Sequence, residues 1–350
     1  MAGIALTPAC EIAMYRFVCP ALLRTVAAAA VVWAAAPAAM AQTTAQAPWP
    51  SQPITMYMTF NAGSGVDVVA RLIQEPVSKI LGQPVIIDYK PGAAGNIASE
   101  YVSRAKPDGY TLVFGTAATH GTNAALYPKL PFDVETDFTP ISPVVTVSNV
   151  LTINPQVIPA NNLKEFVDEI KAHPGKYNFA STGNGTGTHM AFAELNWRLG
   201  LDMVHVPYKG GPDAITAVLR GETCCIMNQV QTVLPHVQSG KLKMLAASTA
   251  QRIAAVPDVA PVAESGLPGT QGFDSAIWFG IFAPKDTPAP IAAKINAAVQ
   301  QALQQPEIRS RLESTGNSLR LESPEQFKQT VHNNRKTQAE IVKAAHIVIQ

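Results

Sequence analysis

The chain has 350 residues, of which 47% are hydrophobic and 15% are charged. A chain of this length and composition can bury a sizeable core, and we expect two domains rather than one. Its formal net charge of +1 argues against nucleic acid or an anionic membrane surface as a partner, because either would select a strongly basic protein.

The N-terminal segment has the pattern of a secretory signal peptide. Arg16 and Arg24 flank the start of an alanine-rich apolar run, and Ala39-Met40-Ala41 fits the small-residue site that signal peptidase cleaves. We therefore expect residues 1–41 to be removed on export. A membrane anchor is disfavoured, because Pro37 ends the uninterrupted run before the roughly 20 residues that a span needs.

Removal of the signal peptide makes the chain electrically neutral. Arg16, Arg24 and Glu11 leave with it, so 26 basic and 25 acidic residues become 24 and 24. A neutral mature protein strengthens the argument against a nucleic-acid partner.

The first of two Gly-rich loops lies near the start of the mature chain. Residues 54–60 are strand-like, Asn61-Ala62-Gly63-Ser64-Gly65-Val66-Asp67 forms the loop, and apolar residues at three- and four-residue spacings predict a helix over 68–81. Such a loop places backbone N–H groups at a helix N-terminus, where they can hold an anion. Asp67 would repel an anion, so we assign it to capping the helix. Pro76 should kink this helix.

Strands and helices alternate along most of the remaining chain. This alternation predicts α/β units with parallel strands and right-handed crossovers. We expect helices between the strands, including one at 163–172. The expected strands are 85–89, 111–115, 144–153, 178–180, 203–206, 224–228, 243–247 and 277–283.

The second Gly-rich loop is Gly183-Asn184-Gly185-Thr186-Gly187-Thr188-His189, between the strand at 178–180 and a helical pattern over 190–199. It lacks the Gly-Lys-Ser/Thr ending of a nucleotide-binding loop, and no Gly-x-Gly-x-x-Gly opens a helix here. The pattern therefore favours a small carboxylate over a nucleotide, although Gly-rich loops also serve as structural turns. Two such loops predict two half-sites that face each other, with both helix dipoles directed at one ligand.

The sequence offers no catalytic or metal-binding pattern. It contains no Gly-x-Ser-x-Gly nucleophile elbow, and its His, Glu and Cys residues show no metal-ligand spacing. Cys224 and Cys225 are adjacent, and since neighbouring cysteines form only a strained bridge, we interpret them as buried thiols in a strand. An exported hydrolase is therefore the weaker hypothesis, and we expect no cofactor and no metal.

Two long helices are expected at the C-terminal end. The first covers about 288–303. The second begins at Ser323-Pro324-Glu325-Gln326, which supplies in order a cap, a proline at the first helical position and the glutamine of a capping box.

Six motifs stand in a fixed order along the chain. They are Pro91-Gly92-Ala93-Ala94-Gly95-Asn96-Ile97, Pro107-Asp108-Gly109-Tyr110-Thr111-Leu112, Leu126-Tyr127-Pro128-Lys129-Leu130-Pro131-Phe132-Asp133, the loop from Gly183 to His189, Val206-Pro207-Tyr208-Lys209-Gly210-Gly211, and Trp278-Phe279-Gly280-Ile281-Phe282-Ala283-Pro284. This series resembles the Bug family, the periplasmic solute-binding receptors of tripartite tricarboxylate transporters. The resemblance covers about residues 49–345.

The resemblance implies a type II periplasmic binding protein, in which two α/β lobes close on a ligand in the cleft between them. The first lobe would comprise 42–145 plus 266–350, and the second 146–265. Family ligands are mostly small carboxylates held by the two Gly-rich loops. Carried over by position, the ligand-binding residues would be Ser64, Gly65, Val66, Thr116, Thr119, His120, Ser181, Gly183, Asn184, Gly185, Thr186, His189, Tyr208 and Asn228.

The chain departs from the family pattern in two places. The first loop has Ser64 and Val66 where relatives usually have glycine and threonine, so one donor is gained and one is lost. Asn228-Gln229 stands where many relatives have an aspartate, which disfavours an amino-acid ligand because its ammonium group needs a carboxylate partner. A diacid with a short apolar or aromatic spacer fits these loops better.

The roles of His189 and His120 each have two interpretations. His189 and His120 could each donate to a carboxylate, or each could tie its loop to the lobe as a neutral ring. The two roles are balanced for His189, and the structural role is favoured for His120. Lys209 fits a loop role better than ligand contact, and Tyr208 is a candidate wall of the cleft.

We therefore expect a monomeric, periplasmic solute-binding protein that is not an enzyme. It would capture a small carboxylate, a dicarboxylate with or without an aromatic ring, and deliver it to the membrane subunits of a tripartite tricarboxylate transporter. A second hypothesis is an exported ligand-sensing protein that presents the carboxylate to a membrane sensor kinase, since both functions need the same closure.

Overall fold

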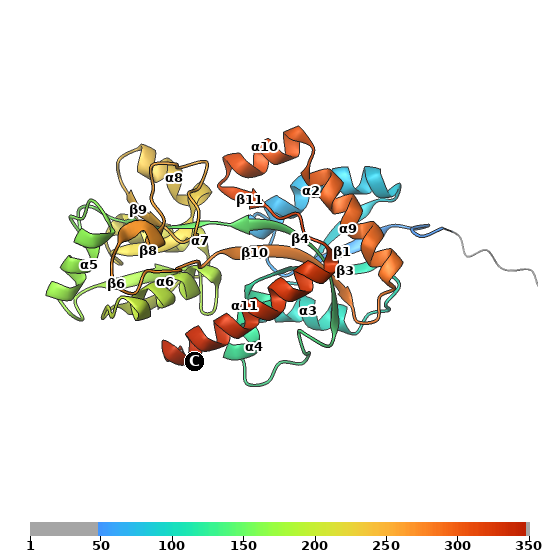
Figure 1. Ribbon diagram of the computed structural model, residues 1–350, viewed down its shortest axis with the longest axis horizontal. Coiled ribbons are helices and arrows are strands. Elements are labelled where there is room, and N and C mark those ends of the chain that lie inside the picture. Colours follow the sequence, from blue (N-terminus) through green and yellow to red (C-terminus); the bar gives the residue numbers. More distant parts are fainter. Residues whose placement is uncertain (1–47, 348–350) are drawn as a thin grey trace, which may run out of the picture. The chain divides into compact units, whose positions relative to one another are not determined.

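Two β-sheets organise the computed structural model, which describes residues 48–347 (Figure 1). The first sheet has six strands in the order β11-β4-β10-β3-β1-β2, and the second has five in the order β7-β6-β8-β5-β9. The expected signal peptide at 1–41 lies outside the described residues.

Strands and helices alternate through most of the described chain. The first sheet contains β1 (Ile54–Met58), β2 (Val85–Tyr89), β3 (Thr111–Thr116), β4 (Phe138–Val147), β10 (Ile277–Pro284) and β11 (Asn317–Leu319). The second contains β5 (Asn149–Ile153), β6 (Asn178–Ser181), β7 (Val204–Pro207), β8 (Cys225–Gln229) and β9 (Lys243–Ala247). The α-helices are α2 (Gly65–Leu81), α3 (Asn96–Ser103), α4 (Asn123–Leu126), α5 (Leu163–Ala172), α6 (Gly187–Arg198), α7 (Gly211–Arg220), α8 (Val230–Gln238), α9 (Ala289–Leu303), α10 (Pro306–Ser314) and α11 (Pro324–Ala344). Short turns of other helix types are η2 (Ala93–Gly95), η3 (Ala118–Thr122) and η4 (Val262–Ser265).

The prediction of parallel strands is right for only part of each sheet. β1 pairs in parallel with β2 and β3, and β6 pairs in parallel with β7 and β8. In contrast, β10 is antiparallel to β3 and β4, and β5 is antiparallel to β8 and β9. β5 and β10 each follow a strand of the other sheet with no α-helix between, so no crossover helix imposes the parallel direction on them.

The single strand expected at 144–153 is wrong. β4 ends at Val147 in the first sheet, β5 begins at Asn149 in the second, and Ser148 belongs to neither. Residues on both sides of the break are buried and mostly apolar, so the hydropathy pattern runs through it without a signal.

The chain returns to the first sheet between β9 and β10, and this connection is hydrogen bonded to the break at Ser148. Asn149 N donates to Ser248 Oγ (3.2 Å), and Ser248 N donates to Asn149 O (2.8 Å). Ser275 N in turn donates to Ser248 O (2.8 Å). The two segments that link the sheets are therefore fastened to each other.

Helices pack on both sheets. The core of the first sheet joins its strands to α2, α9 and α11. On the second sheet, one face packs on α5 and α6, and the other packs on α7 and α8. This burial on two faces explains why strands such as β5 and β8 read as continuous apolar runs rather than as alternating ones.

The helix signals of the sequence are mostly confirmed. Ser323 Oγ accepts from Gln326 N (3.2 Å) and Gln326 Oε1 accepts from Ser323 N (2.9 Å), so the capping box exists. α2 continues past Pro76, which therefore does not end the helix. α10 and β11 were not expected, because α10 buries only Ile308 and Leu312 and β11 has three residues. Within 48–347, no helix has the length and apolar character to cross a membrane.

Gly280 in β10 makes room for Phe327 of α11, and this contact can be tested. A Cβ at Gly280 would lie 2.8 Å from Phe327 Cε1 and 3.0 Å from Ser142 O. Gly280→Ala should therefore lower the free energy of unfolding by about 1–3 kcal/mol through overpacking, as measured by urea denaturation. Gly211→Ala is the control, because its Cβ would meet no atom within 4 Å. Equal stability of the two variants would show that α11 does not pack directly on β10.

Candidate functional site

The first Gly-rich loop forms the start of α2. Ser64 is the N-cap residue, and its Oγ accepts a hydrogen bond from Asp67 N (3.3 Å). The Asp67 carboxylate accepts from Gly63 N (2.8 Å), the residue before the N-cap, so it fastens the loop to the helix start rather than bonding a free N–H of the helix. The N–H groups of Gly65 and Val66 have no partner within residues 48–347, which leaves them able to bind an acceptor.

The charge of Asp67 is offset by its neighbours. Arg71 Nε lies 3.0 Å from Asp67 Oδ1, and the Tyr89 hydroxyl donates to the same oxygen (2.6 Å). Burial acts to raise the pKa of Asp67, but the hydrogen bonds from Tyr89, Gly63 and Arg71 outweigh it and hold this pKa below its usual value. The guanidinium of Arg71 therefore compensates a carboxylate that would otherwise oppose an anion at this loop.

The second Gly-rich loop forms the start of α6, which begins at Gly187 and so inside the expected loop. Thr186 is the N-cap residue. Its Oγ1 accepts from His189 N (3.5 Å), donates to Gly183 O (2.8 Å) and lies 3.0 Å from Thr188 Oγ1. The threonine hydroxyls thus bond within the loop, whereas the N–H groups of Gly187 and Thr188 have no partner in the described chain.

The tip of the second loop depends on glycine. Gly183 and Gly185 have φ values of +132° and +72°, which residues with a Cβ rarely adopt. Asn184 lies between them and is half-buried. The loop can turn back toward α6 only with glycine at these two positions.

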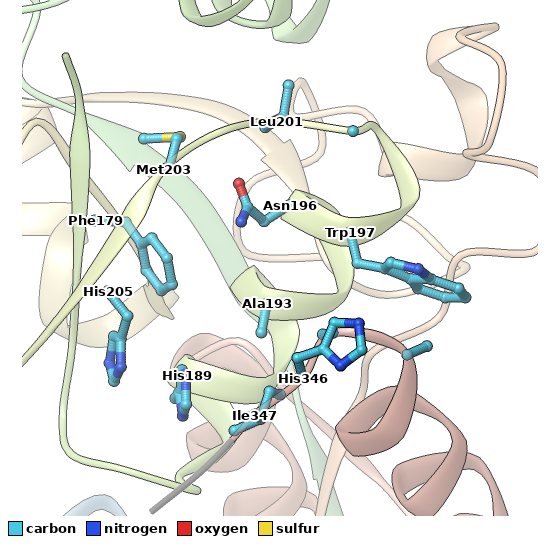
Figure 2. Close-up of a pocket in the computed structure, with 13 residues that line it drawn as sticks. Phe179, His189, Ala193, Asn196, Trp197, Leu201, Met203, His205, His346 and Ile347 are labelled. Atoms are coloured by element: carbon cyan, nitrogen blue, oxygen red, sulfur yellow. The ribbon is translucent and has the colours of Figure 1, made fainter. Parts of the chain in front are cut away.

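His189 is packed as a neutral ring. Figure 2 shows it beside His205, with ring centroids 3.7 Å apart and planes 8° from parallel. His189 Nδ1 accepts from Gly185 N (3.1 Å), and His205 Nε2 lies 2.6 Å from Ser181 Oγ. Burial, and then the charge of His205, lower the pKa of His189 to about 3, while burial lowers that of His205 to about 4. In this structure His189 ties the loop to β6 and β7 and presents no cation.

The loop after β3 is turned into the core. Thr116, Thr119 and His120 were expected to line the cleft, and all three are buried. Thr119 Oγ1 accepts from Thr116 N (2.9 Å) and lies 2.9 Å from His120 Nδ1. The His120 ring stacks on Phe282 at 3.9 Å, and burial lowers its pKa to about 3. This geometry matches the structural role favoured for His120.

Gln229 brings the two sheets together at the first loop. A Cβ at Gly65 would lie 2.6 Å from Gln229 Oε1, so this amide reaches the start of α2. Asn228, the expected ligand residue, is buried, and its Oδ1 accepts from Gln229 N (2.9 Å). Tyr208 is half-buried, and its N donates to Ser181 O (3.0 Å). The sequence prediction named Asn228, whereas the residue that reaches the first loop is Gln229; the two neighbours on the strand point to opposite faces.

A cavity of about 480 Å³ lies beside the second loop (Figure 2). His189, His205, Phe179, Asn196 and Trp197 line one side, and the end of α11 closes the other. Its lining includes no residue of the first loop, so this cavity is not the space between the two Gly-rich loops.

Within residues 48–347, no group of three or more His, Cys, Asp or Glu side chains could hold a metal ion. Cys224 and Cys225 are both buried and free, as expected from the sequence. The chemistry that the two loops offer is therefore hydrogen bonding by backbone N–H groups.

Comparison with known proteins relates these features to one family. Residues 69–347 match the family model described as tripartite tricarboxylate transporter family receptor. The chain is 36% identical over 291 residues to a UPF0065 protein of Bordetella bronchiseptica, with 83% of each chain covered. It is 31% identical to Protein BugT of Bordetella pertussis, with 79% of this chain and 84% of that one covered.

Solved structures show the same architecture. MatC from Rhodopseudomonas palustris with bound malate has a TM-score of 0.74 and 35% identity, covering 84% of this chain and 100% of that one. An R. palustris protein with adipate has a TM-score of 0.78 and 27% identity over 86% and 99% of the two chains. The periplasmic binding protein BugD has a TM-score of 0.75 and 31% identity over 86% and 100%. These similarities confirm the predicted two-lobe α/β periplasmic binding protein fold.

Burial of His120 makes stability depend on pH in a defined direction. Its folded pKa is about 3, whereas an unfolded histidine titrates near pH 6.5, so between these values only the unfolded state binds the proton. His120 therefore costs no stability above about pH 6.5 and removes about 1.4 kcal/mol per pH unit as the pH falls toward 3. His120→Phe keeps a ring against Phe282, and its unfolding free energy should fall less steeply between about pH 6 and pH 4.

Urea denaturation across this pH range measures the two slopes. Above about pH 7 they should coincide, because His120 is neutral in both states there. Identical slopes below pH 6 would contradict the burial of a neutral imidazole at this position.

Proposed function

The chain belongs to the tripartite tricarboxylate transporter receptor family, and on that premise we propose that it captures a small dicarboxylate in the periplasm and delivers it to the membrane subunits of such a transporter. The family consists of solute-binding receptors rather than enzymes, so the protein binds its substrate without converting it. The observation that carries the proposal is the set of free N–H groups at the starts of α2 and α6.

These N–H groups suit carboxylates. Gly65 and Val66 offer two donors at one helix start, and Gly187 and Thr188 offer two at the other. A carboxylate has two oxygens, so each helix start matches one carboxylate. The helix dipole adds about 0.3–1 kcal/mol at each end, and hydrogen bonds to a charged group contribute about 1.5–3 kcal/mol. A diacid uses both helix starts, whereas a monoacid uses one.

The donors lie at corresponding ends of the two sheets. α2 follows β1 and α6 follows β6, so each helix starts at the carboxyl end of a parallel strand, where α/β proteins bind ligands. The contact between Gly65 and Gln229 supports a cleft between these ends. We propose that the ligand lies there, held mainly by backbone N–H groups. Ser64 and Thr186 then act as helix caps, since their hydroxyls already bond within their own loops.

Similar proteins support the ligand class. MatC and the R. palustris protein described above hold malate and adipate, which are both dicarboxylates. The neutral Asn228-Gln229 pair also disfavours a ligand with an ammonium group, because no carboxylate stands there to pair with it.

We further propose the boundaries of the mature protein and its lobes. Residues 1–41 form the signal peptide, and the mature chain is a monomer. The first lobe comprises 42–145 plus 266–350, and the second comprises 146–265. The chain changes sheet at Ser148, three residues beyond the proposed limit of the first lobe at 145, and it returns to the first sheet between β9 and β10, where the second limit falls.

Calorimetry on a diacid and its monoester tests whether both helix starts bind a carboxylate. A thermal-shift screen of mono- and dicarboxylates first identifies the diacid, since a ligand that binds only the folded state raises the melting temperature. We expect a dissociation constant in the micromolar range or tighter, about 8 kcal/mol of binding free energy. Esterifying one carboxyl should weaken binding at least tenfold, or by about 1.4 kcal/mol.

Two outcomes would contradict the proposal. Equal affinities for the diacid and the monoester would mean that only one helix start binds a charged group. If sugars or amines raise the melting temperature and none of the carboxylates does, the ligand is not a carboxylate.

A further inference from the structure

Asn149 is a buried asparagine whose side chain lacks hydrogen-bond partners. It is 0% exposed, and neither Oδ1 nor Nδ2 is bonded to any group within residues 48–347. Its backbone is satisfied, because Asn149 N donates to Ser248 Oγ and Asn149 O accepts from Ser248 N. Most buried polar side chains are hydrogen bonded, so a whole amide without a partner calls for a reason.

A comparison within the same segment shows that the fold does not require this arrangement. Asn154, just beyond the other end of β5, is also buried. Its Nδ2 donates to Val218 O (2.9 Å), and its Oδ1 accepts from Gln156 N (3.0 Å). Asn154 is thus a structural asparagine. Asn149 makes no such bonds, and a leucine of similar size would suit its surroundings better as far as folding is concerned.

The position of Asn149 places its side chain on the sheet face that α5 and α6 cover. Strand alternation places it on the same face as Leu151 and Ile153, which pack against the apolar side of α6. Asn149 pairs in register with Gln229, whose amide reaches Gly65 at the start of α2. Asn149 therefore lies beside the residue that reaches the start of α2, on the face that α6 covers.

The two atoms of this amide complement the groups around them. The free N–H groups at the two helix starts are all donors, and so they can bind only acceptors such as carboxylate oxygens. Asn149 Nδ2 adds one more donor. Asn149 Oδ1 is an acceptor, which a dicarboxylate without other polar groups cannot satisfy, because ionised carboxylates carry no proton to donate.

We propose that Asn149 is a specificity-determining residue that selects a hydroxylated dicarboxylate, with Oδ1 accepting from the substrate hydroxyl and Nδ2 donating to the adjacent carboxylate. This inference rests on the proposed function, since it names the chemical group that the same cleft recognises. A site built to bond a hydroxyl discriminates strongly against the analogue that lacks it, because the buried partner is then left unpaired.

Matched ligand pairs test the selection on the mature wild-type protein. The pairs are succinate and malate, adipate and 2-hydroxyadipate, and terephthalate and 2-hydroxyterephthalate. For the pair that fits the cleft, calorimetry should give at least a tenfold tighter dissociation constant for the hydroxylated member. In Asn149→Leu this ratio should fall below about threefold, because neither atom of the amide remains.

Two further variants separate recognition from folding. Asn149→Leu should keep or raise the melting temperature of the free protein, since it removes an unbonded amide, and Asn154→Leu should lower it while keeping the wild-type hydroxyl preference. Asn149→Asp retains an acceptor but adds a negative charge, so it should weaken every dicarboxylate at least tenfold relative to the wild type.

The outcomes distinguish this inference from the proposed function. If the wild type binds no member of any pair or any other carboxylate, the proposed function fails. If dicarboxylates bind but the hydroxyl brings no gain, or if Asn149→Leu keeps the gain, the function stands and the role of Asn149 is wrong. A lower melting temperature for Asn149→Leu together with an unchanged ratio would mark Asn149 as a structural residue only.

Discussion

The first turn of an α-helix leaves N–H groups that the helix itself cannot satisfy, and α2 and α6 manage them in the same way. In each, glycine occupies the first helical position, a hydroxyl side chain caps the third N–H, and the first two N–H groups have no partner within residues 48–347. A Cβ at Gly187 would press on the Ile277 side chain, and one at Gly65 would displace the amide of Gln229 from the helix start. Gly65 and Gly187 therefore supply donors for the ligand and also let neighbouring segments approach the helix starts closely.

The passage of the chain between the sheets is the second constraint. The chain leaves the first sheet at Val147 and joins the second at Asn149, so only Ser148 separates two strands that belong to different sheets. The return connection is hydrogen bonded to this point through Ser248 and Ser275. A change in the angle between the sheets has to be absorbed here, beside the residue that we assign to ligand selection.

The sequence predicted the features that depend on local periodicity and turn residues. The bounds of α5, β2 and β9, the capping box at Ser323 and the place of both Gly-rich loops follow from periodicity and turn residues, and the structure has them. It could not predict features that depend on pairing in space. The break at Ser148 lies inside a buried run, and the antiparallel direction of β10 follows from its route between sheets. The unbonded state of Asn149 appears only when its neighbours are known.

The adjacent thiols of Cys224 and Cys225 affect how an exported protein withstands oxidation. Their sulfur atoms are 3.4 Å apart, both residues are buried, and burial, followed by the hydrogen bond shared with Cys224, raises the pKa of the Cys225 thiol. Thiolate is the form that oxidants and disulfide catalysts attack, so the folded protein offers them little to react with. The two thiols are open to oxidation from the time the chain emerges from the membrane until β8 has folded. Rapid folding of the second sheet would then protect these thiols in an oxidising compartment without any bridge being made.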